Sequence, residues 1–304
     1  MKKMSETILF FGSGPVAAKS LELLSTSFNV EAVVTKPRLS HHKGTVPVIE
    51  TAEKLGLKIY TAVNKKSLDT LIEEAQFQSK VGVLIDFGII VSQEVIDSFE
   101  KGIVNSHFSL LPEWRGADPI TFSILSGQPA TGVSLMLLTA GMDEGPILGY
   151  GQYMLSPSIT APKLTEDLID LSNGLLCELL PLYCEGKISP TPKNDTIKPT
   201  YSRKLTKDDS ILDWSKPAEQ IEREIRAFLE WPRSRCIIGK LEVLITSAHV
   251  IAANGRPGQF AKLNKQLIAY CGSKALAIDT LRLAGKKEMT GQAFLAGHKH
   301  LLNS

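Results

Sequence analysis

The stretch GIVNSHFSLLPEWRG, residues 102–116, runs from an apolar strand through a polar pair into a turn. If residues 102–107 form a strand, their side chains alternate between its two faces, so Asn105 and His107 point to the same side. Open α/β sheets bind their ligands at the carboxyl ends of parallel strands. The sequence therefore predicts that this polar pair faces a ligand site.

The residues around this stretch predict a parallel sheet. Apolar runs rich in Val, Ile and Leu alternate with helical patterns, and a long amphipathic helix over residues 161–186 closes the first half. Apolar strands separated by crossover helices are typical of a parallel sheet covered on both faces. The runs predicted as strands are TILFFG, VEAVVT, KVGVLIDFG, GIVNSH and TGVSLMLLT.

A change in composition and hydrophobic pattern divides the chain after residue 188. Residues 189–206 place prolines among polar residues, which predicts a linker. A helical pattern at 216–231 and then short β-like runs with glycine-containing turns follow, which is typical of a small barrel or sandwich. We therefore expect one domain over residues 1–188 and another over residues 207–304.

The composition is that of an ordinary globular protein, with 304 residues, 43% of them hydrophobic and 22% charged. No apolar run approaches the ~20 residues of a membrane span, and the first apolar run passes straight into a glycine turn, which argues against a secretory signal. The four cysteines show neither CxxC spacing nor a neighbouring His cluster. This predicts free thiols in a cytoplasmic protein rather than a metal site.

The charge is distributed unequally between the two halves. Residues 1–188 carry 15 Lys and Arg against 21 Asp and Glu, a balance of −6, whereas residues 189–304 carry 19 against 11, a balance of +8. A basic module suggests a polyanionic partner. On charge alone, a soluble basic domain without such a partner is an equal alternative.

The segment GSGPVA, residues 12–17, fits the glycine pattern of dinucleotide-binding turns. That pattern also requires an acidic residue at the end of the second strand, about 20 residues further on, to hold the ribose. Here the second strand ends at Thr35 and continues into Lys36 and Pro37. The glycines are therefore interpreted as a tight turn and not as an NAD site.

A third polar group follows the strand TGVSLMLLT. Asp143 lies between Gly141 and Gly145, which allow the backbone to bend sharply. Asn105 can donate to an oxyanion, His107 can exchange a proton near neutral pH, and a carboxylate can orient the imidazole. Singly, each residue type in such a place is more often structural, as a strand cap or part of a turn. Together they suit a reaction in which a carbonyl becomes tetrahedral.

These residues resemble the folate-dependent formyltransferases, which take a formyl group from 10-formyltetrahydrofolate. The likeness lies in N-x-H-x-S-L-L-P-x-x-x-G and in the G-M-D-x-G loop. It implies that Asn105, His107 and Asp143 are catalytic and that no metal is needed. The folate-site residues that it implies are Gly88, Ile89, Ile90, Val91, Ser109, Leu110, Leu111, Pro112 and Gly141.

Over nearly the whole chain the likeness is to the methionyl-tRNA formyltransferases of this family. WRGADPI follows the first motif, and YSRKL, ILDW, IRAF, WP, PG and AGKKEM occur later in that order. The resemblance implies a Rossmann-like parallel-sheet formyltransferase domain, then a small OB-like β-barrel that holds initiator methionyl-tRNA, in a monomer without a protein partner. The implied tRNA-binding residues are Lys36, Arg38, Lys43, Arg115, Lys286 and Lys287.

The segment TKPRLSHHKGTVP, residues 35–47, corresponds to a basic loop by which these enzymes reach the acceptor end of the tRNA. Its adjacent His41 and His42 have no accompanying carboxylate or Cys, so a solvated basic loop is favoured over a metal site. Four residues depart from the family pattern, and they affect the expected affinities and not the reaction type: Asp86, Phe108, Glu113 and Asp118.

The expected reaction is transfer of a formyl group to the α-amine of methionine esterified to initiator tRNA. Enzymes that formylate glycinamide ribonucleotide or an amino sugar nucleotide share the chemistry, and the length and motifs of residues 205–304 argue against them. A silent nucleic-acid-binding protein is the alternative outside enzymes. A hydrolase that releases formate shares the catalytic residues but typically carries an N-terminal regulatory domain.

Overall fold

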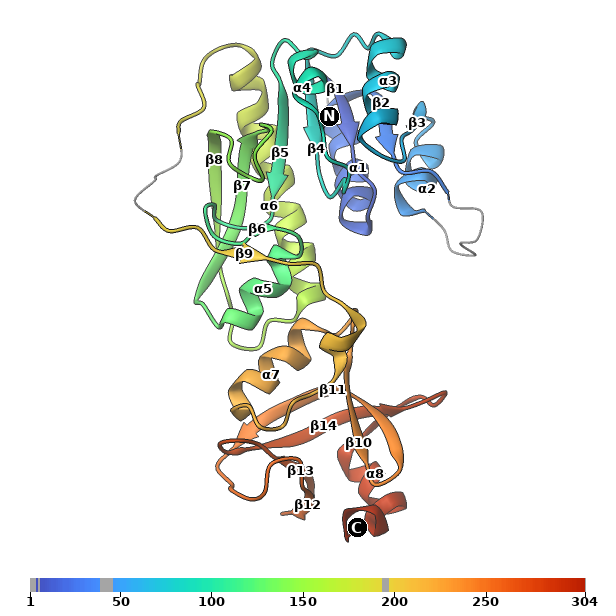
Figure 1. Cartoon of the computed structure of the whole chain (residues 1–304), viewed down its shortest axis with the longest axis vertical. Coiled ribbons are helices and arrows are strands. Elements are labelled where there is room, and N and C mark those ends of the chain that lie inside the picture. The colour runs from blue at the N-terminus through green and yellow to red at the C-terminus, as the bar shows by residue number, and fades with distance from the viewer. Residues whose placement is uncertain (1–3, 5, 39–45, 193–196, 304) are drawn as a thin grey trace. The chain divides into compact units, whose positions relative to one another are not determined.

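The computed structural model describes residues 4, 6–38, 46–192 and 197–303 (Figure 1). It divides into two compact units. The first comprises Met1–Pro119, Ala130–Met154 and Thr165–Ser202, and the second comprises Ile120–Pro129, Leu155–Leu164 and Arg203–Ser304. None of the helices in the described ranges has both the length and the apolar character that a membrane span requires.

The first unit is built on a seven-stranded sheet with the order β3-β2-β1-β4-β5-β7-β8. Neighbouring strands from β3 to β5 pair in parallel, as the sequence predicted. The strands are β1 (Thr7–Phe11), β2 (Asn29–Thr35), β3 (Ile59–Thr61), β4 (Val81–Leu84), β5 (Ile103–His107), β7 (Ala130–Leu137) and β8 (Ile147–Met154).

The prediction of an all-parallel sheet is wrong at one edge. β7 runs antiparallel to β5, and β8 runs antiparallel to β7. Residues 138–146, which join β7 to β8, are too few for the crossover that a parallel neighbour requires, so the chain returns as a hairpin. The sheet is therefore mixed, and it contains a strand, β8, that the sequence analysis did not predict.

Within the described residues, five helices accompany this sheet, and the ends of two of them follow from local chemistry. Pro15 opens the first, and Asn64 caps the third by accepting a hydrogen bond from the backbone N–H of Ser67. The long amphipathic helix predicted at 161–186 is present as the last. The helices are α1 (Pro15–Ser27), α2 (Pro47–Lys54), α3 (Lys65–Ala75), α4 (Gln93–Asp97) and α6 (Ala161–Cys184).

The core beneath the functional edge of the sheet is aromatic and aliphatic. Phe11 at the end of β1 makes edge-to-face contacts with Phe87 and Phe99, at ring-centroid distances of 5.6 and 6.0 Å. Leu9, Val34 and Ile103, from β1, β2 and β5, are fully buried in the same cluster. These contacts fix the strands whose ends carry the polar residues.

The second unit has an antiparallel sheet with the order β10-β11-β14-β13-β12, and β15 pairs with β14. The helix predicted at 216–231 is present as α7, and it packs Ile221 and Ile225 into the apolar core of the unit. The strands are β10 (Ser234–Ile238), β11 (Leu241–Ile251), β12 (Phe260–Leu263), β13 (Gln266–Tyr270), β14 (Ala275–Leu283) and β15 (Glu288–Thr290). The helices are α5 (Pro119–Ser126), η1 (Lys207–Ser210), α7 (Ala218–Ala227), α8 (Gly291–His298) and η2 (Lys299–Asn303).

A small two-stranded sheet completes the first unit. β6 (Arg115–Gly116) pairs in parallel with β9 (Tyr201–Ser202), which lies more than eighty residues further along the chain. β6 belongs to the stretch on which the sequence analysis began.

Candidate active site

The structure brings together the three polar side chains that the sequence singled out. Asn105 Nδ2 donates to Oδ1 of Asp143 over 3.5 Å, and His107 Nδ1 lies 3.7 Å from the same oxygen. Asn105 and His107 are only 7% and 6% exposed. The predicted alternation along β5 is confirmed, because both side chains reach one carboxylate on one face of the strand.

Asp143 reaches this position by a route that the sequence did not predict. Because β7 is antiparallel to β5, its last residue, Leu137, pairs with Val104, so the loop 138–146 leaves the sheet beside the start of β5 and not beside its carboxyl end. The loop then folds over the face of β5. Gly145 permits this fold, since a Cβ there would lie 1.7 Å from the carbonyl oxygen of Leu137.

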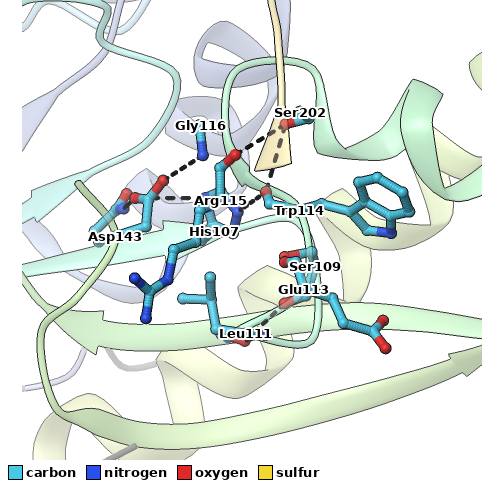
Figure 2. Close-up of polar contacts among 11 residues, drawn as sticks. His107, Ser109, Leu111, Glu113, Trp114, Arg115, Gly116, Asp143 and Ser202 are labelled. Atoms are coloured by element: carbon cyan, nitrogen blue, oxygen red, sulfur yellow. Dashed lines mark hydrogen bonds and ion pairs between the residues drawn. The ribbon is translucent and has the colours of Figure 1, made fainter. Parts of the chain in front are cut away.

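The second nitrogen of His107 is fixed by the turn that follows β5. Nε2 lies 2.9 Å from the carbonyl oxygen of Trp114, as Figure 2 shows. A carbonyl oxygen only accepts, so the hydrogen of this bond is on Nε2. Nδ1 is consequently the nitrogen that faces Asp143 and that can gain or lose a proton there.

The same turn holds the carboxylate. The backbone N–H of Gly116 donates to Oδ2 of Asp143 over 2.7 Å (Figure 2). The guanidinium group of Arg115 pairs with Glu144 at 2.9 Å, and the Arg115 side chain is 13% exposed. Arg115, which the resemblance assigned to tRNA, therefore joins the turn to the Asp143 loop within this unit.

The SLLP segment forms a tightly hydrogen-bonded turn. Ser109 is fully buried, its hydroxyl donates to the carbonyl oxygen of Glu113 over 2.5 Å, and its own carbonyl accepts from Ser134 Oγ over 2.6 Å. Ser134 Oγ in turn accepts from the backbone N–H of Leu111, which precedes a cis bond to Pro112. Ser109, predicted to line the folate site, thus supports the turn from inside.

The segment assigned to the pterin, residues 88–91, follows β4. Ile90 is 78% exposed, whereas Val91 is buried. Gly88 has a φ of +66°, and a Cβ there would lie 2.7 Å from Lys36 Nζ, so the lysine side chain rests against this segment. Lys36 was predicted to contact tRNA. Arg38 is exposed, and Lys43, His41 and His42 lie outside the described residues.

Asp86 stands at the end of β4, beside the glycine turn of β1. Its carboxyl oxygen occupies the place of a Cβ on Gly14, at 1.7 Å. One side of Asp86 is open to solvent, but the protein atoms crowded around the carboxyl group, and then the Asp118 carboxylate, raise its pKa to about 6 against the opposing effect of Lys36.

This arrangement argues against a dinucleotide site at GSGPVA. The backbone N–H groups of Ser13 and Gly14 already donate to the carbonyl oxygen of Asp86, over 3.0 and 3.3 Å. Phosphate-binding turns need such N–H groups for the ligand. A carboxylate at the same place also repels a phosphate. The glycines therefore make a tight turn, as the sequence predicted.

Two further observations concern metal and thiol chemistry. Across the part of the chain that the structure describes, no group of three or more His, Cys, Asp or Glu residues is placed to hold a metal ion. Cys177, Cys184, Cys236 and Cys271 are free thiols.

An amide donor and an imidazole on a buried strand, with a carboxylate from the neighbouring loop, suit chemistry at a carbonyl carbon. Comparison with known proteins names the class. Residues 8–180 match the family "Formyl transferase", and residues 204–299 match "Formyl transferase, C-terminal domain". The chain belongs to the formyl transferase family.

Relatives within this family resemble the chain along nearly its whole length. It is 33% identical over 300 residues to a methionyl-tRNA formyltransferase of Pseudoalteromonas translucida (strain TAC 125), covering 95% of this chain and 93% of that protein. It is 34% identical over 291 residues to the methionyl-tRNA formyltransferase of Roseiflexus sp. (strain RS-1), covering 93% and 89%.

Solved structures share the fold at lower identity. The N-formyltransferase from Helicobacter canadensis, in complex with folinic acid and dTDP-3-aminofucose, aligns with a TM-score of 0.67. The alignment covers 90% of this chain and 99% of that one, at 20% sequence identity.

The sequence analysis missed the contacts that support the side chains of His107 and Asp143. Trp114 and Gly116 act through backbone atoms, which carry no sequence signature. Ser202 on the distant strand β9 and Thr200 just before it contact the turn, and no periodicity or spacing predicts a two-residue pairing across this separation. Of these contacts, only the Arg115–Glu144 ion pair could have been suggested by the sequence. The two residues carry opposite charges, and they lie in the N-x-H-x-S-L-L-P-x-x-x-G motif and the G-M-D-x-G loop.

Proposed function

We propose that this protein transfers the formyl group of 10-formyltetrahydrofolate to the α-amine of methionyl initiator tRNA, for translation initiation. The observation that carries the proposal is the agreement of two findings. Relatives named methionyl-tRNA formyltransferase match the chain over nearly its whole length, and Asn105, His107 and Asp143 meet in one cluster.

The reaction exchanges one carbon–nitrogen bond for another. The neutral amine attacks the formyl carbon and forms a tetrahedral intermediate with a negatively charged oxygen. The bond from that carbon to N10 of the folate then breaks, N10 takes up a proton, and the attacking nitrogen releases one. The products are the formylated amine and tetrahydrofolate.

Each catalytic side chain has a role that its contacts support. Asn105 Nδ2 donates to the developing oxyanion. His107, whose Nε2–H is bound to the Trp114 carbonyl, presents Nδ1, which stabilises the oxyanion and delivers a proton to N10. Asp143, held by the Gly116 N–H, orients His107 and assists the loss of the amine proton.

The folate co-substrate is assigned to two segments beside this cluster. Residues 88–91 offer backbone groups and the exposed Ile90 side chain, which suit a flat heteroaromatic ring. The turn of residues 109–112, with Gly141 from the neighbouring loop, forms the other wall. The hydrogen bonds of Ser109 to Glu113 and Ser134 give this wall a fixed shape.

We assign the tRNA to basic residues of both halves of the chain. The balance of +8 over residues 189–304 suits phosphate binding, and Lys286 and Lys287 are exposed in the turn between β14 and β15. Lys36, Arg38, Lys43 and Arg115 complete the set of residues assigned to the tRNA.

The domain organisation is part of the proposal. We propose that the antiparallel sheet of residues 207–304 is OB-like, that residues 1–188 carry the catalysis and that residues 189–206 link them. A cytoplasmic monomer is part of the same proposal.

The test is a panel of acceptors with 10-formyltetrahydrofolate as donor. Methionyl initiator tRNA is compared with uncharged tRNA, glycinamide ribonucleotide and an amino sugar nucleotide. Formylation of the charged tRNA alone is expected. Transfer to a small amine would overturn the assigned acceptor, and tRNA affinity without any transfer would favour a silent binder.

The Asp143→Ala variant tests the catalytic assignment. Loss of the carboxylate is expected to lower turnover by about 10²–10⁴-fold, the usual contribution of a positioned acid–base group. Asp170→Asn, which neutralises an exposed carboxylate on α6, serves as the control with unchanged turnover. Near-normal turnover in Asp143→Ala would refute the role of Asp143.

A further inference from the structure

Thr200, which immediately precedes β9, and Ser202 within β9 are hydrogen bonded to the turn of residues 112–116. The backbone N–H of Trp114 donates to the Thr200 hydroxyl over 2.9 Å, and the N–H of Arg115 donates to the Thr200 carbonyl over 2.9 Å. The N–H of Thr200 donates to the carbonyl of Pro112 over 3.3 Å. Thr200 thus contacts three residues of the turn.

Ser202 continues the contact at the other end of the turn. Its hydroxyl donates to the carbonyl oxygens of Trp114 and Arg115 over 3.4 and 3.3 Å, as Figure 2 shows. Its backbone pairs with Gly116 so closely that a Cβ on Gly116 would lie 2.6 Å from the Ser202 carbonyl oxygen. The glycine is required because β9 occupies this space.

The groups that β9 holds are the groups that orient the catalytic side chains. The carbonyl of Trp114 binds His107, and the N–H of Gly116 binds Asp143. A shift of the turn would therefore move the imidazole and the carboxylate together. Small misplacements of reacting groups cost much of the rate enhancement that proximity provides.

We propose that Thr200 and Ser202 are positioning residues for formyl transfer, which hold the turn of residues 112–116 so that His107 and Asp143 keep their catalytic geometry. The proposal rests on the proposed function for its reaction. It assigns a catalytic consequence to a segment that lies outside the motifs of the site.

Thr200 offers the sharper test, because its side chain is exposed and its hydroxyl has a defined partner. Thr200→Val keeps the shape and removes the acceptor for the Trp114 N–H, whereas Thr200→Ser keeps the hydroxyl. Thr191→Val is the matched control, since Thr191 also precedes β9 and bonds the Ile147 carbonyl through its hydroxyl, away from the turn.

The first readout is steady-state formyl transfer to methionyl initiator tRNA. Thr200→Val is expected to lower kcat about tenfold and to leave both KM values within about twofold, because a positioning contact affects the transition state more than substrate binding. Thr200→Ser is expected to restore kcat, and Thr191→Val to leave it unchanged. An unchanged kcat in Thr200→Val, or an equal loss in Thr191→Val, would overturn the proposal.

The second readout does not depend on turnover. Hydrogen–deuterium exchange of the free protein is expected to quicken in residues 112–118 of Thr200→Val and not in Thr191→Val. Unchanged exchange there would refute the role of Thr200 even if the enzyme used another acceptor. A wild-type protein that formylates no acceptor would instead refute the proposed function, which separates the two failures.

Discussion

Replacement of Gly116 by alanine perturbs the structure at the centre of the catalytic turn. Gly116 has a φ of +99°, a conformation that costs an L-residue on the order of 1–3 kcal/mol. The added Cβ would also lie 2.6 Å from the Ser202 carbonyl, so β9 must move and weaken about two hydrogen bonds, at about 1 kcal/mol each. Gly116→Ala is therefore expected to lower the free energy of unfolding by about 3–5 kcal/mol.

The same substitution at Gly56 separates the cost of the positive φ from the cost of the clash with β9. Gly56 also has a positive φ, +66°, but no neighbouring atom lies within 4 Å of the Cβ position. Gly56→Ala is thus expected to cost only the strain of a left-handed L-residue, about 1–2 kcal/mol, and to leave activity unchanged. The difference in free energy of unfolding between Gly116→Ala and Gly56→Ala therefore reports mainly the cost of displacing β9.

The assay is a urea titration followed by circular dichroism, with turnover measured on the same preparations. Because the Gly116 N–H binds Asp143, a displaced turn is expected to lower turnover at least tenfold. The reasoning would be refuted if Gly116→Ala were no less stable than Gly56→Ala and retained normal turnover.

Three further outcomes are expected. Because the folded protein raises the pKa of Asp86 from 3.8 to about 6, the stability that this group contributes is complete below pH 4 and is lost as the pH rises through 6. Asp86→Asn, which tolerates the φ of +46°, should therefore unfold at higher urea than the wild type at pH 8 and at the same urea near pH 3.5. Burial raises the pKa of Cys236 to about 12 and that of Cys271 to about 11, so Ellman's reagent should modify both slowly in the native protein at pH 8 and rapidly in guanidinium. Glu144→Gln should cost less than about 1 kcal/mol of stability, since its ion pair with Arg115 is partly exposed, but should lower turnover several-fold by loosening the Asp143 loop.

The parallel half of the first sheet was predictable, because its strands are apolar runs between helical patterns. β8 was not. A Cβ on Gly149 would lie 2.3 Å from Leu179, and one on Gly151 would lie 2.8 Å from Leu171. α6 therefore packs so closely on β8 that glycines replace the β-branched residues by which a strand is recognised.

The meeting of the three polar side chains was also predictable, but the groups that hold them were not. Alternation along one strand placed Asn105 and His107 together, and bracketing glycines marked Asp143. Their orientation depends on a carbonyl at Trp114 and an N–H at Gly116, and every residue has such groups. The sequence therefore indicates the chemistry of the site, and only the folded chain shows how that chemistry is oriented.

Because backbone groups orient the side chains of the site, two departures from the family pattern, Phe108 and Glu113, leave the site intact. Phe108 is buried just after the end of β5, and the cluster of Asn105, His107 and Asp143 forms beside it. Glu113 contributes its backbone carbonyl, which accepts from Ser109 whatever the side chain is.

The other two departures add charge beside the site. Asp86 interacts with the carboxylate of Asp118 and with Lys36, the residue that rests against Gly88 in the segment assigned to the pterin. Substitution of either carboxylate changes the electrostatic environment of that lysine and none of the contacts among Asn105, His107 and Asp143. Asp86→Asn should consequently alter the KM for the folate more than kcat. The opposite result, a loss confined to kcat, would place Asp86 in the chemical step.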